Sequence, residues 1–97
     1  MSAVMIKSFA DRETRRVWDR ERSRAVPADL QRKALQKLEQ IDVVDDLNEL
    51  RVPPGNKLEK LGGDRAGQHS IRINRQYRVC FVWEDGDAYE VEIVDYH

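Results

Sequence analysis

The clearest periodic pattern of hydrophobic positions lies in residues 30–41. Leu30, Ala34, Leu38 and Ile41 follow one another at spacings of four, four and three. This spacing places them on one side of an α-helix and predicts a stripe that packs into a core. Val26-Pro27 precedes the stripe, and proline suits the first turn of a helix, so we predict that this helix begins there.

The segment before this helix predicts a short strand followed by a first helix. Residues 4–9 are mostly apolar and are typical of a strand. Asp11 follows, and its carboxylate suits the N-cap of a helix over residues 12–21. The apolar side of that helix is thin, since it consists of Val17 and Trp18.

The second half of the chain alternates apolar and polar positions, which predicts strands at 57–61, 70–74, 78–83 and 87–97. The apolar sets that should face the helices are Ile71 and Ile73; Val79, Phe81 and Trp83; and Tyr89, Val91 and Ile93. A two-residue turn at Asp85-Gly86 would bring Phe81 opposite Glu90, which contradicts this alternation. We therefore predict a three-residue loop around Asp85-Gly86-Asp87. Two pairings follow: Phe81 opposite Val91, and Arg78 opposite Val94.

The order of these elements, β-α-α-β-β-β-β, predicts an α+β fold. We expect one domain over residues 1–97, with residues 1–4 a possible N-terminal extension before Met5. Its antiparallel-dominated sheet should have about four to five strands, with two to three helices packed on one face. The other face of the sheet should then lie open to water.

Composition narrows the class of protein. The 97 residues are 40% hydrophobic and 36% charged, which fits a small globular domain. The sequence shows no membrane-spanning stretch and no signal peptide, and its single cysteine, Cys80, suits the cytoplasm.

The net charge of −1 hides an uneven distribution. Residues 12–24 are rich in arginine, but acids interleave with them, so this cluster also fits an ordinary solvated helix face. Residues 65–78 carry Arg65, Arg72, Arg75 and Arg78 without an acid between them. A local basic face of this kind can bind phosphate even in a nearly neutral protein.

The alternation places Arg72, Arg78 and Tyr96 on the face away from the helices, with Arg75 in the adjoining loop and Asp95 and His97 beside Tyr96. RNA cleavage without a metal needs a base, an acid and cations that stabilise the phosphorane. Arg78 and Arg72 suit the cationic role, because guanidinium binds phosphate through paired hydrogen bonds. His97 suits a base or acid. Tyr96 suits proton transfer or stacking on a base, and Asp95 could orient His97 or hold the strand end.

Other interpretations of these residues remain open at this point. The terminal residues could form a frayed strand end, and the same face could bind phosphate, RNA or a protein without catalysis. A metal site built from His69, Cys80, Asp95 and His97 lacks paired ligand spacing, and no cofactor is expected. Cys80 as a nucleophile lacks a base nearby in the sequence.

Several segments resemble the HigB toxins of the RelE-like superfamily of bacterial type II toxin–antitoxin modules. They are Met-Ile-Lys-Ser-Phe (5–9), Pro-Pro-Gly-Asn-Lys-Leu-Glu (53–59), Gly-Asp-Arg-Ala-Gly-Gln-His-Ser-Ile-Arg-Ile-Asn (63–74), Tyr-Arg-Val-Cys-Phe (77–81) and Val-Asp-Tyr-His (94–97). The resemblance implies a compact sheet with helices on one face, and a ribosome-dependent endoribonuclease that cuts mRNA in the decoding site without a metal. It also implies a HigA-like helix-turn-helix antitoxin, through which the complex would bind operator DNA.

Family roles carry over to individual residues as what the resemblance implies. Arg78 matches the phosphate-binding catalytic cation, and Asp95, Tyr96 and His97 match the C-terminal catalytic corner. Arg65, Arg72 and Arg75 match RNA-binding basic positions in kind. The sequence departs from the pattern at three places: Glu59 and Gly62 stand where some members carry histidine and lysine, and Asn74 stands where an arginine is expected.

Overall fold

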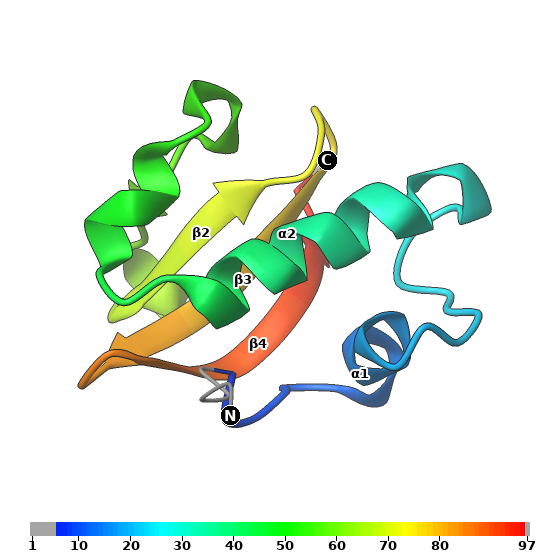
Figure 1. The fold of residues 1–97 in the computed structure, drawn as a ribbon, viewed down its shortest axis with the longest axis horizontal. Coiled ribbons are helices and arrows are strands. Elements are labelled where there is room, and N and C mark those ends of the chain that lie inside the picture. Colours follow the sequence, from blue (N-terminus) through cyan, green and yellow to red (C-terminus); the bar gives the residue numbers. More distant parts are fainter. Residues whose placement is uncertain (1–5, 97) are drawn as a thin grey trace.

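A computed structural model describes residues 6–96 of the chain and shows an α+β fold. Four antiparallel strands form one sheet in the order β1-β2-β3-β4: β1 Glu59–Lys60, β2 Gln68–Arg72, β3 Tyr77–Glu84 and β4 Asp87–Asp95. Helix α2, Gln31–Val43, lies across one face of the sheet, and α1, Arg12–Trp18, lies beside β4 (Figure 1). The predicted fold class is therefore confirmed. None of the described helices is long and apolar enough to cross a bilayer.

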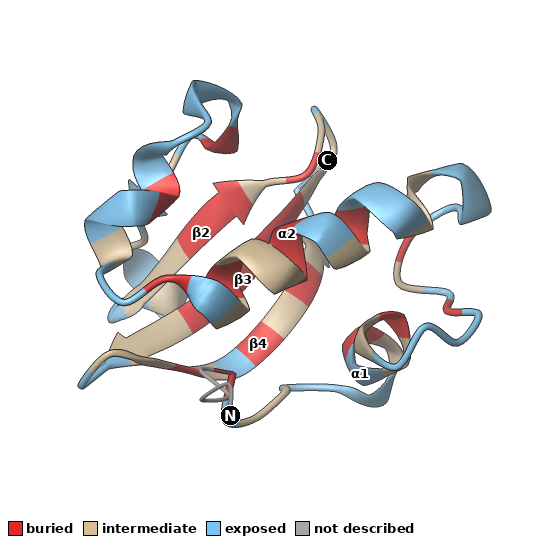
Figure 2. Ribbon diagram, viewed as in Figure 1, coloured by how far each residue is buried: buried red, intermediate tan, exposed pale blue. Residues whose placement is uncertain are grey.

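Helix α2 supplies the centre of the core. Ala34, Leu38 and Ile41 of the predicted stripe have no exposed surface, and they pack with Phe81 of β3. The α-helix begins at Gln31, four residues later than predicted, because residues 28–30 form a short 3-10 turn. Buried positions alternate with less buried ones along much of β4, whereas β2 and β3 each contain a run of consecutive buried residues (Figure 2).

The N-terminal segment attaches to the outer edge of β4. Ile6 and Phe9 form isolated parallel bridges to Ala88 and Val91, so the predicted first strand is irregular, and its residues 4 and 5 lie outside the described residues. Asp11 caps α1 as predicted, accepting a hydrogen bond from the Thr14 amide at 2.6 Å. The helix ends at Trp18, three residues earlier than predicted.

The β3–β4 hairpin differs from the prediction. Glu84 pairs with Asp87, so the turn has two residues, and both Asp85 and Gly86 have positive φ, of 52° and 83°. This turn type matches the right-handed twist of the strands and favours Asp-Gly. The predicted three-residue loop is therefore wrong.

A β-bulge in β4 restores the alternation that the shorter turn would have broken. Between the pairs Val82–Tyr89 and Cys80–Glu92, β3 contributes one residue, Phe81, and β4 contributes two, Glu90 and Val91. Glu90 takes φ of 53°, as the extra residue of a bulge can. Val91 and Ile93 then face the core and Arg78 pairs with Val94 as predicted, but the buried partner nearer the turn is Ala88 and not Tyr89.

Candidate active site

Arg78 lies on the face of β3 that points away from α2, because its neighbours Val79 and Phe81 are core residues. Its Nε donates to the Ser70 hydroxyl at 2.8 Å, and its Nη2 donates to the carbonyl oxygen of Lys57 at 2.6 Å. Nη2 also lies 3.2 Å from a carboxylate oxygen of Glu59. These contacts hold the guanidinium in one orientation.

We predicted that the sheet face away from α2 lies open to water, and this prediction is wrong for the middle of that face. Ser70 and Cys80 are fully buried, and Arg78 is only 8% exposed. The covering groups come from residues 57–65: the Lys57 carbonyl and the Glu59 carboxylate contact Arg78, and Arg65 reaches Glu92, the strand partner of Cys80. A covering loop of this kind leaves no mark in strand alternation, since alternation reports only which side chains share a face.

The Lys57 carbonyl is aimed at Arg78 by a buried polar clamp at Asn56. Asn56 is fully buried; its Oδ1 accepts from Lys37 Nζ at 2.6 Å, and its Nδ2 donates to the Leu50 carbonyl at 3.1 Å. Lys57 follows with φ of 48°, which turns the backbone toward β3. Burial, together with Lys33, lowers the pKa of Lys37. The clamp thus ties α2 to the segment that orients Arg78.

Tyr96 completes the contact that the alternation predicted. The Arg78 guanidinium carbon lies 5.8 Å from the centre of the Tyr96 ring, a cation–π distance, and the tyrosine remains 47% exposed. The Tyr96 amide donates to the Gln76 carbonyl at 2.6 Å, which ties it to the β2–β3 turn. Arg78 and Tyr96 are therefore brought together on the face away from α2.

Arg72 adds a second guanidinium to this corner. It pairs directly with Arg78 across β2 and β3, and its Nε donates to the Asn74 carbonyl at 3.0 Å. Like charges directly opposite each other in a sheet repel, and a bound anion would remove that repulsion. Arg75 is exposed in the adjoining turn.

Of the three remaining predicted residues, the structure describes Asp95 and Arg65 and does not describe His97. Asp95 pairs with Tyr77, and its Oδ2 accepts from Gln76 Nε2 at 3.1 Å, so it does hold the strand end. His97 lies outside the described residues. Arg65 is joined to Glu92 at 3.1 Å, and this hydrogen bond raises its pKa.

The surroundings of Cys80 and His69 do not favour the roles of nucleophile and metal ligand that were considered for them. Cys80 is fully buried in mid-strand, and burial raises the pKa of its thiol, which disfavours the thiolate that a nucleophile needs. His69 lies near the Phe81 ring, and burial, with Lys60 nearby, lowers the pKa of its imidazole. Among the described residues, no three histidine, cysteine or acidic side chains lie close enough together to hold a metal ion.

Sequence reasoning did not place Glu59 in the site. It appeared only as a departure from the family pattern, whereas the structure pairs its carboxylate with Arg78. The pairing Glu59–Ser70 brings it there, because Ser70 lies beside Arg78 on the same face. A two-residue β1 inside a polar segment gives little periodic signal, so only the long-range register could have revealed it.

Comparison with solved structures identifies the fold. The YoeB–YefM complex from Staphylococcus aureus contains a chain with a TM-score of 0.58 and 18% identity, covering 98% of both chains. The YoeB dimer from the same organism gives a TM-score of 0.56 at 19% identity, covering 97% of both. The chain therefore has the same fold as the YoeB chains of these structures.

Sequence comparison identifies the family within that fold. The model of "RelE-like toxin of type II toxin-antitoxin system HigB" matches residues 7–97. Toxin HigB-1 of Vibrio cholerae serotype O1 is 43% identical over 70 residues, which cover 72% of this chain and 74% of that protein. Endoribonuclease HigB of Proteus vulgaris is 33% identical over 93 residues, covering 96% and 100%. The chain belongs to the HigB family of RelE-like toxins.

Proposed function

We propose that this HigB-family toxin is a ribosome-dependent endoribonuclease that cleaves mRNA in the decoding site without a metal. It acts in the cytoplasm, where the ribosomes are, and a HigA-like helix-turn-helix antitoxin neutralises it and carries the complex to operator DNA. The name of the Proteus vulgaris relative supports the nuclease activity. The YoeB–YefM complexes support a protein antitoxin as the partner.

The observation that carries this proposal is the position of the Arg78 guanidinium. Its Nε and Nη2 are engaged by the protein, and no described residue accepts a hydrogen bond from its Nη1. The Tyr96 ring lies against the same guanidinium, and Arg72 stands opposite it. A fixed, always-charged group with donors still available is suited to a phosphate oxygen, especially one that gains charge in the transition state.

The reaction follows from these roles. A base removes the proton of the ribose 2′-hydroxyl, and that oxygen forms a bond to the adjacent phosphorus. The bond from phosphorus to the 5′-oxygen breaks, and an acid protonates the leaving oxygen. The products are a 2′,3′-cyclic phosphate and a 5′-hydroxyl, and Arg78 and Arg72 stabilise the phosphorane between them. Tyr96, His97 and Asp95 form the corner that transfers protons, and Arg65 and Arg75 extend the RNA-binding surface.

The test is expression of Arg78→Ala beside the matched control Arg12→Ala, which removes an exposed arginine of α1. We expect wild type and control to arrest growth and to leave transcripts ending in 2′,3′-cyclic phosphate, and Arg78→Ala to cleave roughly 10²- to 10³-fold more slowly. Because Arg78 is buried, its removal also disturbs the fold, so a second variant truncated after Asp95 checks the corner independently. Full cleavage by a folded Arg78→Ala protein would contradict the proposal.

One observation favours a second candidate, a binding module without catalysis. Arg78 is held by three protein acceptors, as a purely structural arginine would be. Such a module would bind RNA or a protein through the same face, and the wild-type chain would then neither arrest growth nor leave cyclic phosphate ends.

A further inference from the structure

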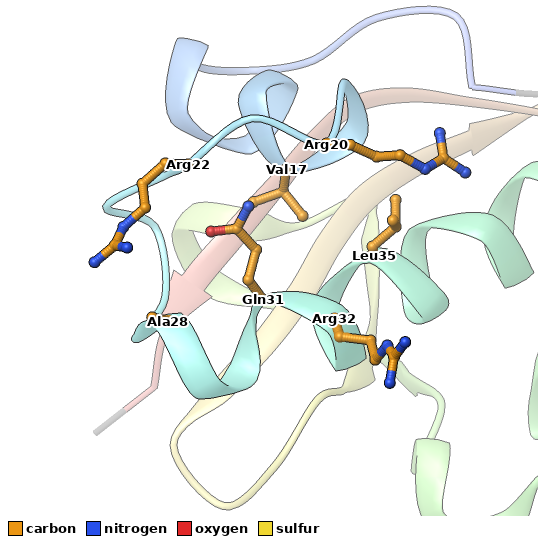
Figure 3. Close-up of a pocket in the computed structure, with 7 residues that line it drawn as sticks. All are labelled: Val17, Arg20, Arg22, Ala28, Gln31, Arg32 and Leu35. Atoms are coloured by element: carbon orange, nitrogen blue, oxygen red, sulfur yellow. The ribbon is translucent and has the colours of Figure 1, made fainter.

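A hollow lies between α1 and the start of α2, on the helical side of the molecule (Figure 3). Its apolar lining comes from Val17, Ala28 and Leu35. Three arginines, Arg20, Arg22 and Arg32, line it as well, and their guanidinium groups extend outward around it (Figure 3). The hollow therefore combines an apolar floor with a cationic rim.

Two neighbouring hollows share lining residues with this one, and we call the three together the groove. One shares Arg22 and Ala28 with it and adds Arg16 and Arg24. The other shares Arg20 and Leu35 with it and adds two large apolar residues, Trp18 and Val43, together with three acids, Asp19, Glu39 and Asp42. Val43 is 71% exposed, although it is the last residue of α2. The arginines thus lie toward one end of the groove and the acids toward the other, so an acidic partner would contact the arginine end.

The charge of this region opposes that of the whole chain. Residues 12–33 contain eight lysine and arginine residues and four acids, while the complete chain has a net charge of −1. Part of that charge is neutralised locally: Arg20 pairs with Glu39 and Arg15 with Asp19. No acid among the described residues lies within ion-pair distance of Arg22 or Arg32.

We infer that this groove binds an acidic, amphipathic segment of the antitoxin, so that the inference rests on the proposed function for the identity of the partner. Apolar side chains of that segment cover Val17, Ala28 and Leu35, and its carboxylates pair with Arg22 and Arg32. An apolar floor favours a protein segment over RNA, because an RNA backbone presents phosphates and few apolar groups to such a surface. Arginine is also among the residues enriched at strongly contributing interface positions.

The experiment compares two double charge reversals in the full chain. The test variant is Arg22→Glu with Arg32→Glu. The control is Arg12→Glu with Arg51→Glu, at exposed arginines that do not line the groove. Each is expressed alone and together with the protein encoded by the reading frame that adjoins its gene. Binding of that protein is then measured by calorimetry at about 0.15 M and about 0.5 M NaCl.

We expect both variants to arrest growth when expressed alone, and only the test variant to escape neutralisation. Its dissociation constant should rise roughly tenfold or more at the lower salt concentration, and the gap from wild type should narrow at the higher one. Substituting lysine for the facing acids of the partner should restore binding to the test variant.

Two results would overturn the inference. Neutralisation of the test variant equal to that of the control would show that the groove does not bind the partner. Loss of growth arrest in the test variant alone, with its thermal unfolding unchanged, would assign the arginines to RNA or the ribosome instead. A wild-type chain that arrests no growth would contradict the proposed function itself, which is a separate outcome.

Discussion

At the scale of single residues, Arg78 has two tasks that pull in different directions. Its contacts with the Lys57 carbonyl and the Glu59 carboxylate hold the segment before β2 against β3, while the proposed function needs the same guanidinium for a phosphate. A five-donor, always-charged side chain can do both, because protein acceptors use one edge and a ligand uses another. Lysine offers three donors on one nitrogen and could not fix the same orientation.

Glu59 lies beside Arg78, and this position makes it a second candidate for the base, in addition to the corner of Tyr96, His97 and Asp95. Its side chain is 56% exposed although that of Arg78 is only 10% exposed, so water reaches the carboxylate while it pairs with the guanidinium. We expect Glu59→Gln to slow mRNA cleavage roughly 100-fold, since glutamine can still accept from Arg78 but cannot take the 2′-hydroxyl proton. Single-turnover cleavage of the same ribosome-bound mRNA by the two proteins measures this difference. A variant with the wild-type rate would limit Glu59 to holding Arg78.

The Asn56 clamp gives a prediction on stability. Asn56→Ala removes the oxygen that accepts from Lys37 and leaves that buried ammonium without its partner. We expect the free energy of unfolding to fall by about 1–3 kcal/mol, measured by urea denaturation. The double variant Lys37→Met, Asn56→Leu replaces both polar groups by apolar ones and should lose less than the single variant. An Asn56→Ala protein as stable as wild type would show that the clamp adds nothing.

At the scale of elements, the β3–β4 hairpin sets the register of the site. Its two-residue turn and its bulge act together: the turn alone would put Phe81 opposite Glu90, and the extra residue in β4 returns Arg78 to the place opposite Val94. The Ser8 hydroxyl accepts from the Glu90 amide at 2.9 Å, so the N-terminal segment stabilises the bulge. The hydrogen bond between Ser8 and Glu90, at the edge of the sheet, thereby helps to determine which side chains of β4 lie in the site.

Gly86 tests the importance of this turn. Its φ of +83° suits glycine, and a Cβ there would meet no heavy atom closer than the Asp45 carbonyl at 3.9 Å, so backbone strain dominates the effect of a substitution. We expect Gly86→Ala to lower the free energy of unfolding by about 1 kcal/mol, read as a drop in the midpoint of thermal unfolding. Gly62→Ala is the matched control, because Gly62 has φ of −124° and open space around it. Equal midpoints for the two variants would contradict the argument.

Elements with a local signal could be predicted from the sequence, and elements defined by distant contacts could not. The stripe of Ala34, Leu38 and Ile41 and the cap at Asp11 are short-range patterns, and both are confirmed. The bulge at Glu90 depends on pairing with another strand, and the burial of Arg78 depends on contacts with Lys57 and Glu59, which are distant in the sequence. For the site, strand alternation predicted which side chains share a face but not what would cover that face.

At the scale of the whole molecule, arginines that are proposed to bind ligands lie on two separate surfaces. Arg72 and Arg78 lie on the sheet face away from α2, and the groove arginines Arg22 and Arg32 lie on the helical side. The acids elsewhere in the chain keep the net charge at −1. Neither surface alone gives the broad positive field that nonspecific RNA binding depends on.

This distribution supports the proposed dependence of the toxin on the ribosome. Few cations are available at the site, because Arg65 is paired with Glu92 and part of Arg78 is engaged by the protein. Free mRNA should therefore bind weakly, whereas a ribosome that holds both mRNA and toxin supplies the orientation that the reaction needs. We expect purified toxin to cut an mRNA on the programmed ribosome roughly 10³-fold or more faster than the same mRNA free in solution. Arg78→Ala is the control for contaminating nuclease, and equal rates on free and ribosome-bound mRNA would show that the chain positions RNA by itself.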